Sequence, residues 1–303
     1  MTATRIGFIG VGSMGWPMAN CLHQAGFPIT AFDAAPGQAA RFASEIGGQA
    51  APDCKTLAAQ SDVIITMLPT SEIVEQVLQG PQGVLAGLRK GATIVEMSSG
   101  VPAHTQRLAQ MVADAGGELV DAPVSGGVPR ARTGELAIMF GGDAATLERL
   151  RPVLQAMGKS LLHTGVVGSA HAMKALNNLV SAGGFLIGVE AMLIGQQFGL
   201  NPETIVDVLN ASTGMNNSTQ KKFKQFVLSR AFNSGFGLDL MVKDLSIALG
   251  IGRDTGTPTP FASLCREMWA AAGKSLGKGA DHTAIAKLSE QLAGVELQSK
   301  QTD

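Results

Sequence analysis

The amino-acid sequence predicts an α/β protein in which a doubly wound sheet is followed by an all-helical C-terminal domain. Three observations support this prediction. Short apolar runs alternate with helical patterns as far as about residue 165, which is typical of βαβ units. A glycine-rich turn follows the first apolar run. Beyond residue 199 the pattern is helical throughout, with breaks rich in Ser, Thr, Asn and Gly at 211–218 and 233–237.

The composition is that of a folded protein with small-molecule partners. A chain of 303 residues, 45% of them hydrophobic, supplies enough apolar material for two domain cores. The formal net charge is −1 and the sequence has no basic block, which excludes the charge pattern of a nucleic-acid-binding or membrane-surface protein. We therefore expect a small-molecule substrate, with no nucleic acid and no membrane as a partner.

Cysteine usage and the N-terminus both indicate a cytoplasmic protein. The three cysteines, Cys21, Cys54 and Cys265, are odd in number and widely spaced, so they predict reduced thiols rather than a disulfide framework or a metal site. The first residues lack the charged and apolar regions of a secretory signal. We expect no metal and a cytoplasmic location.

The glycine-rich turn has the pattern of a dinucleotide-binding site. An apolar strand from Arg5 leads into Gly10-Val-Gly12-Ser13-Met14-Gly15, and a helical pattern then runs to Ala25. In this G-x-G-x-x-G arrangement the first glycine permits the turn, the second lets the backbone approach a pyrophosphate, and the third lets the helix pack on the strand. The amides at the start of the helix attract the phosphate anion.

A second strand, 28–33, ends at Asp33, 18 residues after Gly15. This spacing fits the carboxylate that binds the adenine-ribose hydroxyls. A carboxylate there repels the 2′-phosphate of NADP, and the following Ala34-Ala35-Pro36-Gly37 contains no arginine to bind it. Asp33 therefore predicts NAD as the cofactor. The alternative is that Asp33 caps a helix starting near Pro36.

Two further strands, 62–69 and 93–97, flank a helix at 71–78 and predict the rest of the cofactor crevice. Ligands of doubly wound sheets bind beyond the carboxyl ends of the strands, so Leu68, Pro69 and the segment Ser98-Ser99-Gly100 are expected to line it. Ordinary loop structure is the alternative.

The segment Ser125-Gly126-Gly127 follows a helix at 103–115 and a strand that starts at Glu118. It is interpreted as a small-residue loop whose backbone amides and hydroxyl suit a carboxylate, with a plain turn as the alternative. A strand at 136–140, a helix at 144–157 and a strand at 159–163 complete the first domain.

A long helix then joins two domains. It is expected to begin with Ser169 as its N-cap and to reach Gln197; roughly 28 residues span on the order of 42 Å, more than one domain needs. We expect an NAD-binding domain over 1–165 and a helical substrate-binding and oligomerisation domain over 166–303. The apolar stretch of the long helix, 179–194, is interrupted and shorter than the ~20 residues of a membrane span, which predicts a buried helix.

This helix carries the candidate catalytic residues. Lys174 and Asn178 are four residues apart and share one face, with Asn177 and His171 beside them. A lysine is costly to bury unless it is paired or functional, but a solvated lysine between surface asparagines is an equal alternative on this stretch alone. A second lysine, Lys243, lies in an apolar helical run after Phe236.

The motifs together resemble those of the β-hydroxyacid dehydrogenase family, which includes 3-hydroxyisobutyrate dehydrogenase and tartronate semialdehyde reductase. The resemblance covers nearly the whole chain. It rests on the segment 7–15, on Asp121-Ala-Pro-Val-Ser125-Gly126-Gly127, on Lys174-x-x-Asn177-Asn178, and on Phe236 with Leu240-Met241-x-Lys243-Asp244-Leu. Ala170 and His171 depart from the family pattern, where Gly and Gln are common, and His171 is interpreted as a packing histidine.

The resemblance implies an NAD-dependent oxidation of a 3-hydroxy carboxylate to its semialdehyde or ketone. The expected substrate is 3-hydroxyisobutyrate-like, or a 3-hydroxy amino acid such as serine or phenylserine. Lys174, held by Asn178, would be the acid/base, a role that requires a lysine pKa lowered from its ordinary ~10.4 towards neutrality. Ser125, Gly126, Gly127, Phe236 and Lys243 would bind substrate, and Lys243 would also contact the cofactor and act as the cationic neighbour.

Two other functions compete with this one. An imine reductase shares the two-domain shape, but typically lacks the catalytic lysine that Lys174 supplies here. A non-catalytic NAD-binding protein would not need Ser125, Lys174 and Asn178 together. The apolar helical region also predicts a homodimer or homotetramer, because its content exceeds what one small bundle hides.

Overall fold

The computed structural model describes residues 4–298 of the chain. By its internal contacts the chain divides into two compact units, Met1–Lys174 and Ala175–Asp303. The boundary falls within one long helix. The first unit is an α/β sheet domain and the second is helical, which confirms the predicted fold class.

A single sheet organises the first unit, with strand order β3-β2-β1-β4-β5-β6-β8-β7 and β9 paired to β8. The order 3-2-1-4-5-6 is that of the Rossmann fold, in which the strand order reverses between β1 and β4. The strands are β1 (Ile6–Ile9), β2 (Ile29–Phe32), β3 (Gln49–Ala50), β4 (Val63–Thr66), β5 (Thr93–Glu96), β6 (Glu118–Asp121), β7 (Val124–Ser125), β8 (Leu136–Gly141) and β9 (Gly158–Gly165).

The far edge of the sheet departs from the parallel βαβ arrangement of the other strands. β8 runs antiparallel to both β6 and β7, and only β9 is parallel to it. β6 and β7 run in the same direction, since both are antiparallel to β8, and only residues 126–135 connect β7 to β8. This connection is shorter than the roughly dozen residues that a parallel crossover needs. The sheet is therefore parallel from β3 to β6 and mixed beyond β6.

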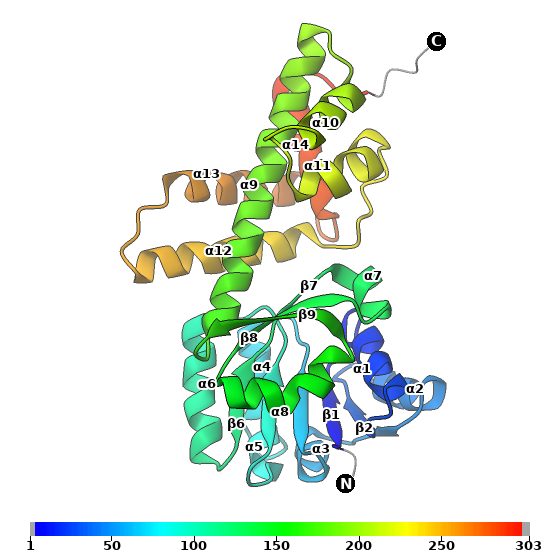
Figure 1. Cartoon of the computed structure of the whole chain (residues 1–303), viewed down its shortest axis with the longest axis vertical. Helices are drawn as coiled ribbons and strands as arrows, with labels where there is room; N and C mark the ends of the chain where they lie inside the picture. Colours follow the sequence, from blue (N-terminus) through cyan, green and yellow to red (C-terminus); the bar gives the residue numbers. More distant parts are fainter. Residues whose placement is uncertain (1–3, 299–303) are drawn as a thin grey trace. The chain divides into compact units, whose positions relative to one another are not determined.

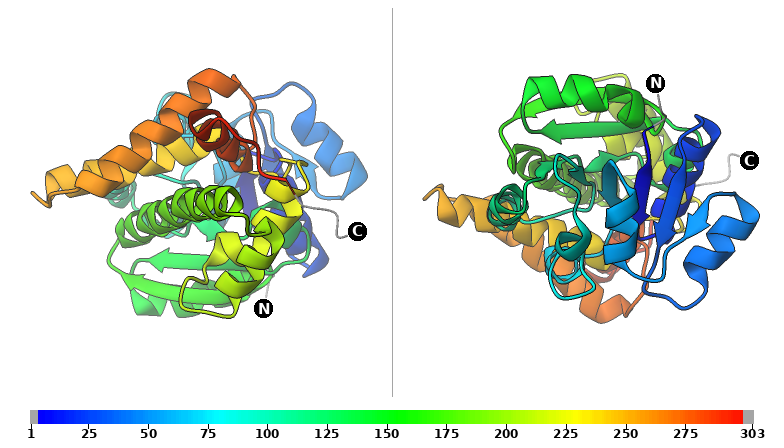
Figure 2. Two further views of the ribbon diagram at one scale, coloured as in Figure 1. Left: turned by 90° about the horizontal axis from the view of Figure 1, so that it is seen from above. Right: turned by 90° about the horizontal axis from the view of Figure 1, so that it is seen from below.

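Two hydrophobic cores lie on the two faces of the sheet, because successive side chains of a strand point in opposite directions. On β1, Phe8 belongs to one core and Ile9 to the other; on β4, Ile65 and Ile64 divide in the same way. Helices therefore cover both faces, as Figures 1 and 2 show. The helices are α1 (Gly15–Gln24), α2 (Gln38–Glu45), α3 (Cys54–Gln60), α4 (Ser71–Leu78), α5 (Val84–Gly87), α6 (Pro102–Asp114), α7 (Gly127–Arg132) and α8 (Ala144–Gln155).

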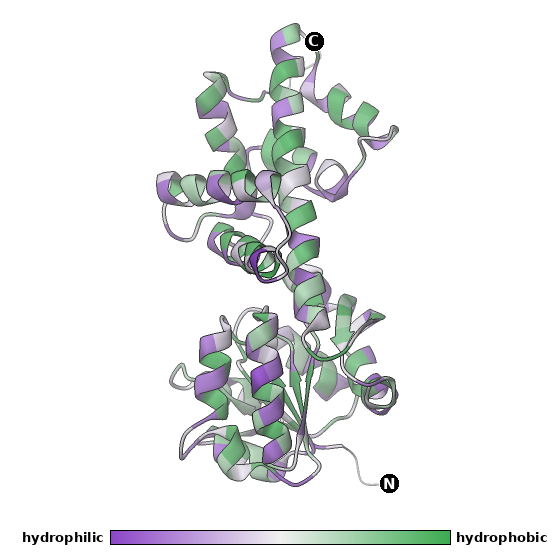
Figure 3. Ribbon diagram, turned by 90° about the vertical axis from the view of Figure 1, so that its left-hand side faces the viewer, coloured by the Kyte–Doolittle hydropathy of each residue, from purple (hydrophilic) through white to green (hydrophobic). Residues whose placement is uncertain are grey.

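Helix α9 (Ser169–Phe198) is one continuous helix of 30 residues, as predicted. Apolar residues recur along its whole length (Figure 3), and by length and composition it could cross a membrane. However, 56% of its most apolar window is buried inside the structure, and a buried core helix passes the same test. Val180, Ile187 and Ile194 are exposed. The prediction of a buried helix was therefore wrong for one of its faces.

The second unit packs helices around the C-terminal part of α9. Its core contains aromatic side chains, among which Phe185 of α9 meets Phe223 edge to face with ring centroids 5.2 Å apart. Asn216 caps α11 through a capping box with Thr219. The further elements are α10 (Pro202–Asn210), α11 (Asn217–Lys221), the π-helix η1 (Phe223–Leu228), α12 (Leu238–Asp254), α13 (Pro260–Leu276), the 3-10 helix η2 (His282–Ile285) and α14 (Ala286–Ala293).

All three cysteines are buried free thiols, as expected from their spacing. Burial raises the pKa of Cys54 to about 12 and that of Cys265 to about 11. Because the thiolate is the reactive form, these cysteines are chemically inert at neutral pH.

Candidate active site

The turn between β1 and α1 carries the three glycines of the predicted cofactor motif, and each fits its role for a separate reason. Gly10 has a φ of 94°, and a Cβ there would lie 2.4 Å from the Met67 carbonyl oxygen. A Cβ on Gly15 would lie 1.8 Å from the Gly10 carbonyl oxygen, so α1 packs on the turn only through glycine. At Gly12 a Cβ would meet no atom of residues 4–298 within 4 Å. The space beside Gly12 is therefore open to a ligand.

The start of α1 leaves its amides available to an anion. Ser13 is exposed and Met14 is half-buried. Met14 occupies the N-cap position, and no side chain within the described part of the chain provides a capping hydrogen bond there. The first amides of a helix carry partial positive charge, so this end of α1 suits a phosphate.

Asp33 lies at the end of β2 and is bound to the glycine turn. Its Oδ2 accepts a hydrogen bond from the Val11 amide at 2.9 Å, and its Oδ1 accepts one from the Ala35 amide at 2.8 Å. Helix α2 has Gly37 as its N-cap, so the alternative that Asp33 caps this helix was wrong. Two amides use half of the ~four acceptor positions of a carboxylate, which leaves Asp33 able to accept two ribose hydroxyls.

The loops after β4 and β5 are joined to each other. The Leu68 amide donates to the Ser98 hydroxyl at 2.8 Å, and the Ser98 amide donates to Glu96 Oε1 at 2.8 Å. Pro69 and Ser99 lie in these two loops, at the carboxyl edge of the sheet. The structure thus brings together the two segments that the sequence assigned to the crevice.

The first unit therefore fits a nicotinamide dinucleotide. Its β1, β2, β4 and β5 are parallel, so the segments that follow their carboxyl ends share one edge of the sheet, which is where this fold binds its cofactor. Within residues 4–298, no group of three or more His, Cys, Asp and Glu side chains is placed to hold a metal ion. The residues that would hold the dinucleotide are Gly10, Gly12, Ser13, Met14, Gly15, Asp33, Leu68, Pro69 and Ser99.

The segment Ser125-Gly126-Gly127 is tighter than the loop expected from the sequence. Ser125 ends β7, where it pairs with Ala137 of β8, and Gly127 already begins α7. Gly126 has a φ of 134°, and a Cβ there would lie 2.7 Å from Cδ of Arg130. The segment is therefore a strand-to-helix turn rather than an open loop, and Ser125 is half-buried within it.

The first turn of α9 is bound to Asp121, the last residue of β6. Asp121 Oδ1 accepts a hydrogen bond from the Gly168 amide at 2.7 Å, and Oδ2 accepts one from the His171 amide at 2.8 Å. Ser169 is already helical and its hydroxyl bonds to that of Thr164, so the expectation that Ser169 is the N-cap was wrong. Gly168 has no side chain, and the carboxylate of Asp121 caps the helix from the sheet instead.

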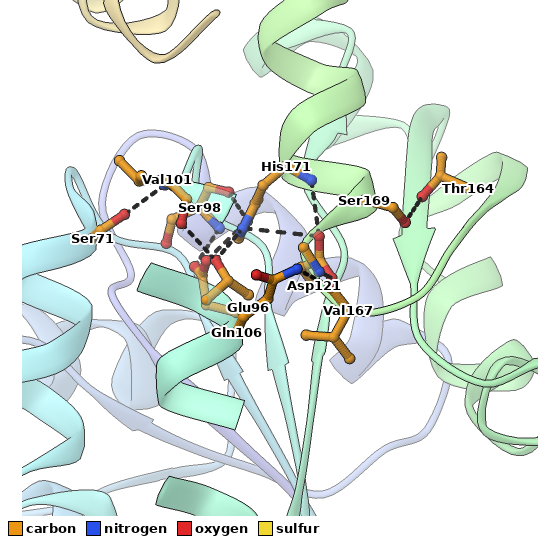
Figure 4. Close-up of polar contacts among 12 residues, drawn as sticks. Ser71, Glu96, Ser98, Val101, Gln106, Asp121, Thr164, Val167, Ser169 and His171 are labelled. Atoms are coloured by element: carbon orange, nitrogen blue, oxygen red, sulfur yellow. Dashed lines mark hydrogen bonds and ion pairs between the residues drawn. The ribbon is translucent and has the colours of Figure 1, made fainter. Parts of the chain in front are cut away.

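His171 is buried in a polar cluster rather than in an apolar core (Figure 4). Its Nε2 lies 2.9 Å from Glu96 Oε2 and 2.9 Å from the Ser98 carbonyl oxygen. Its Nδ1 lies 2.7 Å from the Thr105 hydroxyl. The interpretation of His171 as a packing histidine is therefore incomplete, because the ring is also ion-paired.

Lys174 follows His171 by about one helical turn, and only 8% of it is exposed. This burial excludes the alternative of a solvated surface lysine. A buried lysine is rare unless a partner or a function holds it there.

In the second unit, Asn178 is buried and its side-chain amide is oriented by its neighbours. Asn178 Nδ2 donates to Asp244 Oδ2 at 2.6 Å, and Asn178 Oδ1 accepts from Asn177 Nδ2 at 3.1 Å. A carboxylate only accepts, so Asp244 fixes which end of the Asn178 amide is the donor. Lys243 Nζ lies 3.7 Å from Asp244 Oδ1 and its side chain is 26% exposed.

Phe236 packs edge to face on His282, with ring centroids 5.5 Å apart. The segment that carries it is held by Asp281, whose carboxylate accepts hydrogen bonds from the Gly235 amide and the Ser234 hydroxyl. Burial, together with the charge of Lys222, lowers the pKa of His282 to about 4, so this ring is neutral at physiological pH. The Phe236 segment is thus fixed within the helical unit.

Sequence reasoning assigned no role at the site to four residues, although three of them were named in the motifs or beside Lys174: Glu96, Asp121, His171 and Asp244. Each is a charged or ionisable side chain inside an apolar run, and each is at least nine-tenths buried. The signal was present, since a carboxylate placed among Ile, Val and Leu must find a partner. What the sequence lacks is the identity of the partner.

Two family models together match most of the chain. Residues 5–167 match the model described as the NAD binding domain of 6-phosphogluconate dehydrogenase. Residues 168–289 match the model described as the NAD-binding of NADP-dependent 3-hydroxyisobutyrate dehydrogenase.

Individual relatives align over nearly full length. The chain is 38% identical to 2-(hydroxymethyl)glutarate dehydrogenase from Eubacterium barkeri over 298 residues, which is 98% of each chain. It is 33% identical to 2-hydroxy-3-oxopropionate reductase from Escherichia coli, over 97% of this chain and 99% of the relative. Among solved structures, 3-hydroxyisobutyrate dehydrogenase from Mycobacterium tuberculosis with L-serine is similar with a TM-score of 0.86 at 32% identity, covering 94% of this chain and 99% of that one.

Proposed function

The chain belongs to the β-hydroxyacid dehydrogenase family and is therefore an oxidoreductase that acts on a CH–OH group with NAD(P); from this premise we propose that it oxidises a 2-substituted 3-hydroxypropionate with NAD. Lys174 acts as the acid/base in this proposal. The observation that carries it is the burial of Lys174, at 8% exposure, one turn before the buried Asn178 on the same helix face.

The substrate class follows from the chemistry that the named relatives share. The molecules 2-(hydroxymethyl)glutarate, 3-hydroxyisobutyrate and L-serine each carry a CH2OH group on the carbon that bears the carboxylate. The molecule 2-hydroxy-3-oxopropionate is the aldehyde of the same skeleton. These compounds differ in the third substituent on that carbon. We propose that the substrate contains the common unit HOCH2–CH(R)–COO−. A substrate screen can identify the group R.

The proposed mechanism assigns one task to each group of residues. In oxidation the substrate loses a hydride from the CH2OH carbon and a proton from its oxygen, which leaves the aldehyde. The bound nicotinamide supplies the hydride acceptor. Lys174 takes the hydroxyl proton, and returns it in the reverse direction. The turn at Ser125, Gly126 and Gly127 anchors the substrate carboxylate.

Asn178 supports Lys174 in this mechanism. Asp244 holds the Nδ2 end of the Asn178 amide at 2.6 Å, so Oδ1 is the end that remains an acceptor. Its position four residues after Lys174 on one helix face makes it the neighbour of the lysine along α9. Asp244 therefore belongs to the proposed site as a positioning residue.

The test is a turnover screen of 3-hydroxyisobutyrate, glycerate, L-serine, 2-(hydroxymethyl)glutarate, threonate and 3-phenylserine, with formation of the reduced cofactor as the readout. Activity confined to compounds with a CH2OH group on the carbon that bears the carboxylate would support the proposal. Reduction of cyclic imines without turnover of any hydroxy acid would instead indicate an imine reductase. Absence of turnover with both sets would favour a non-catalytic role.

We expect NAD to be preferred over NADP. Asp33 offers two acceptor positions to ribose hydroxyls, whereas its charge repels a 2′-phosphate; the nearby Arg41 is paired with Glu45 and stacked over Trp16. Replacement of Asp33 by Ala is expected to reduce the kcat/KM ratio of NAD to NADP at least about tenfold, from the repulsion of two charges a few ångströms apart. Glu148→Gln, which removes an exposed carboxylate from α8, is the control. A tenfold preference of the parent enzyme for NADP would contradict the assignment.

We also expect a homodimer or homotetramer. Val180, Ile187 and Ile194 recur every seven residues on α9 and are 76%, 57% and 71% exposed, which gives α9 an exposed face with large apolar side chains suited to a second copy of the chain. Sedimentation velocity should show no monomer at micromolar concentration, and Ile187→Lys should shift the protein towards monomer. Ile187→Val, which keeps this face apolar, is the control. A monomeric parent would remove this expectation.

A further inference from the structure

Three ionisable side chains meet beneath the first turn of α9, and all three are almost fully buried (Figure 4). Glu96 ends β5, Asp121 ends β6 and His171 lies in α9, with exposures of 3%, 0% and 1%. Charged groups are buried at such a position only when they are paired and hydrogen-bonded. The cluster therefore has to contain opposite charges that pair with one another.

The hydrogen bonds around the His171 ring are compatible with a proton on both of its nitrogens. Nε2 faces the Glu96 carboxylate and the Ser98 carbonyl oxygen, which only accept. Nδ1 faces the Thr105 hydroxyl, and that hydroxyl donates its own proton to the Val101 carbonyl oxygen at 3.2 Å. A ring with a proton on each nitrogen is an imidazolium cation. The contacts thus accommodate a positive charge between the two carboxylates.

The charges around the ring agree with this assignment. Burial opposes the cation, but Glu96 and then Asp121, whose Oδ2 lies 3.9 Å from Nδ1, together raise the pKa of His171 above its ordinary value. Burial likewise opposes ionisation of Glu96, but His171 and the Ser98 hydroxyl and amide lower its pKa. Burial raises the pKa of Asp121, against the opposing effects of the His171 charge and of the Gly168 and His171 amides. With both carboxylates ionised, the cluster carries one net negative charge at the N-terminus of α9, the sign that the helix dipole favours.

Two glycines make room for the cluster. A Cβ on Gly100 would lie 2.8 Å from the His171 ring and 3.1 Å from Glu96 Oε2. A Cβ on Gly141, which pairs with Asp121 across β6 and β8, would lie 2.3 Å from Asp121 Oδ1. Gly100 and Gly141 have ordinary backbone angles, so space rather than φ requires glycine. The surrounding chain is thus shaped to hold these three side chains.

The cluster acts on Lys174 through the helix. Asp121 holds the Gly168 and His171 amides, Glu96 holds the His171 ring, and Lys174 is the next residue on the same face, three positions later. We propose that His171, clamped between Glu96 and Asp121, is a positioning residue that fixes the start of α9 and thereby the place of the Lys174 amine. The proposal rests on the assigned role of Lys174, but it also makes claims that do not depend on activity.

A neutral replacement of either partner should displace Lys174 and slow the reaction. His171→Gln leaves two buried carboxylates without a cation, and Glu96→Gln leaves a buried imidazolium beside a neutral amide. Misplacement of a catalytic group by about 1 Å costs up to ~100-fold, so we expect kcat to fall about tenfold to 100-fold in each variant, with KM for the hydroxy acid changed much less. In the Lys174→Ala background the same substitutions should cause no further loss of kcat, because they act through the lysine.

Glu118→Gln is the matched control. Glu118 is the first residue of the same strand, β6, at the opposite end from Asp121. Its carboxylate is bound to Arg149 and Thr146. This variant also removes one carboxylate from β6, and kcat should match the parent. A further loss of kcat when His171→Gln is added to Lys174→Ala would show that the cluster acts elsewhere than on the lysine, and would overturn the proposal.

Two readouts are independent of turnover. In 15N-resolved NMR spectra the His171 ring should keep protons on both nitrogens well above the ordinary histidine pKa of ~6.5. Reductive methylation followed by mass spectrometry should find Lys174 protected in the parent and in Glu118→Gln, but modified faster in His171→Gln and Glu96→Gln. If no hydroxy acid is oxidised, the proposed function fails while these two readouts still decide the clamp. A neutral ring at pH 7, or equal protection of Lys174 in all variants, would refute it.

The pH dependence of stability has a defined sign. A raised histidine pKa in the folded state stabilises the fold fully below the unfolded value of ~6.5, and this contribution is lost as pH rises through the folded-state pKa. Glu96, Asp121, Thr105 and the Ser98 carbonyl are the groups that face the ring. The difference in unfolding free energy between the parent and His171→Gln should therefore be largest near pH 6 and should decrease at alkaline pH. A difference that grows with pH would contradict a buried imidazolium.

Discussion

Replacement of Lys174 by alanine is expected to lower kcat at least about 100-fold while the protein still binds its cofactor. General acid/base catalysis contributes ~10²–10⁴-fold, so the loss of transition-state stabilisation should be about 3 kcal/mol or more. The Kd of the dinucleotide should stay close to that of the parent, because the glycine turn and Asp33 lie at the ends of β1 and β2 rather than on α9. Kinetics across pH and equilibrium cofactor binding measure the two quantities separately.

Arginine should not replace Lys174, because a guanidinium stays protonated at working pH and cannot accept the substrate proton. A small primary amine added to Lys174→Ala should restore part of the activity if the missing group is a proton carrier. Lys159→Ala, which removes an exposed lysine paired with Glu135, is the control and should leave kcat unchanged. Activity of Lys174→Ala within tenfold of the parent would reject the assignment, and a large loss of cofactor affinity would show that the lysine has a structural role.

Local signals in the sequence were sufficient for most of the fold. Helix α4 occupies Ser71–Leu78 as predicted, because Thr70 caps it by accepting the Ile73 amide and the apolar residues recur on one face. Strands β1, β4 and β5 were predicted because short, fully buried apolar runs between glycines and polar residues leave few alternatives. Strand β3 was missed because two exposed residues, Gln49 and Ala50, carry no periodic signal.

Strand direction was not encoded in the local pattern. The run Leu136–Gly141 is apolar whether its strand lies parallel or antiparallel to β6, so the sequence predicted β8 but not its orientation. The predicted N-cap of α9 was wrong for a related reason. Ser169 is a good N-cap by residue type, but the carboxylate that caps the helix comes from Asp121, 48 positions away from Ser169 in the chain, and is brought there only by the sheet.

The candidate site likewise contains residues that local sequence patterns reveal and residues whose partners are distant in the sequence. The glycine motif and Asp33 were found because their spacing along the chain reflects a single strand-turn-helix unit. The partners of the buried polar residues were not found, since Glu96 meets His171, and Asn178 meets Asp244, only in the folded protein. An ionisable residue within an apolar run marks such a position in the sequence. Its hydrogen-bond partner, however, is set by the tertiary structure.

Alanine at Gly12 and alanine at Gly15 are expected to have opposite effects on folding and on cofactor binding. A Cβ at Gly12 would meet no atom of residues 4–298 within 4 Å, and its backbone is outside the left-handed region, so Gly12→Ala should unfold at the parent temperature. The added methyl group would fill the space where the backbone approaches the pyrophosphate. We expect the dinucleotide Kd to rise at least about tenfold, which corresponds to about 1.4 kcal/mol.

In Gly15→Ala the new Cβ would lie 1.8 Å from the Gly10 carbonyl oxygen, a backbone atom that cannot move without opening the turn. Overpacking of this kind costs about 1–3 kcal/mol or more, so Gly15→Ala should lower the unfolding temperature in the absence of any cofactor. Thermal unfolding and cofactor titration of both variants measure the two effects. Equal losses of stability in the two variants would show that Gly12 also has a packing role, and an unchanged Kd in Gly12→Ala would place the pyrophosphate elsewhere than beside this turn.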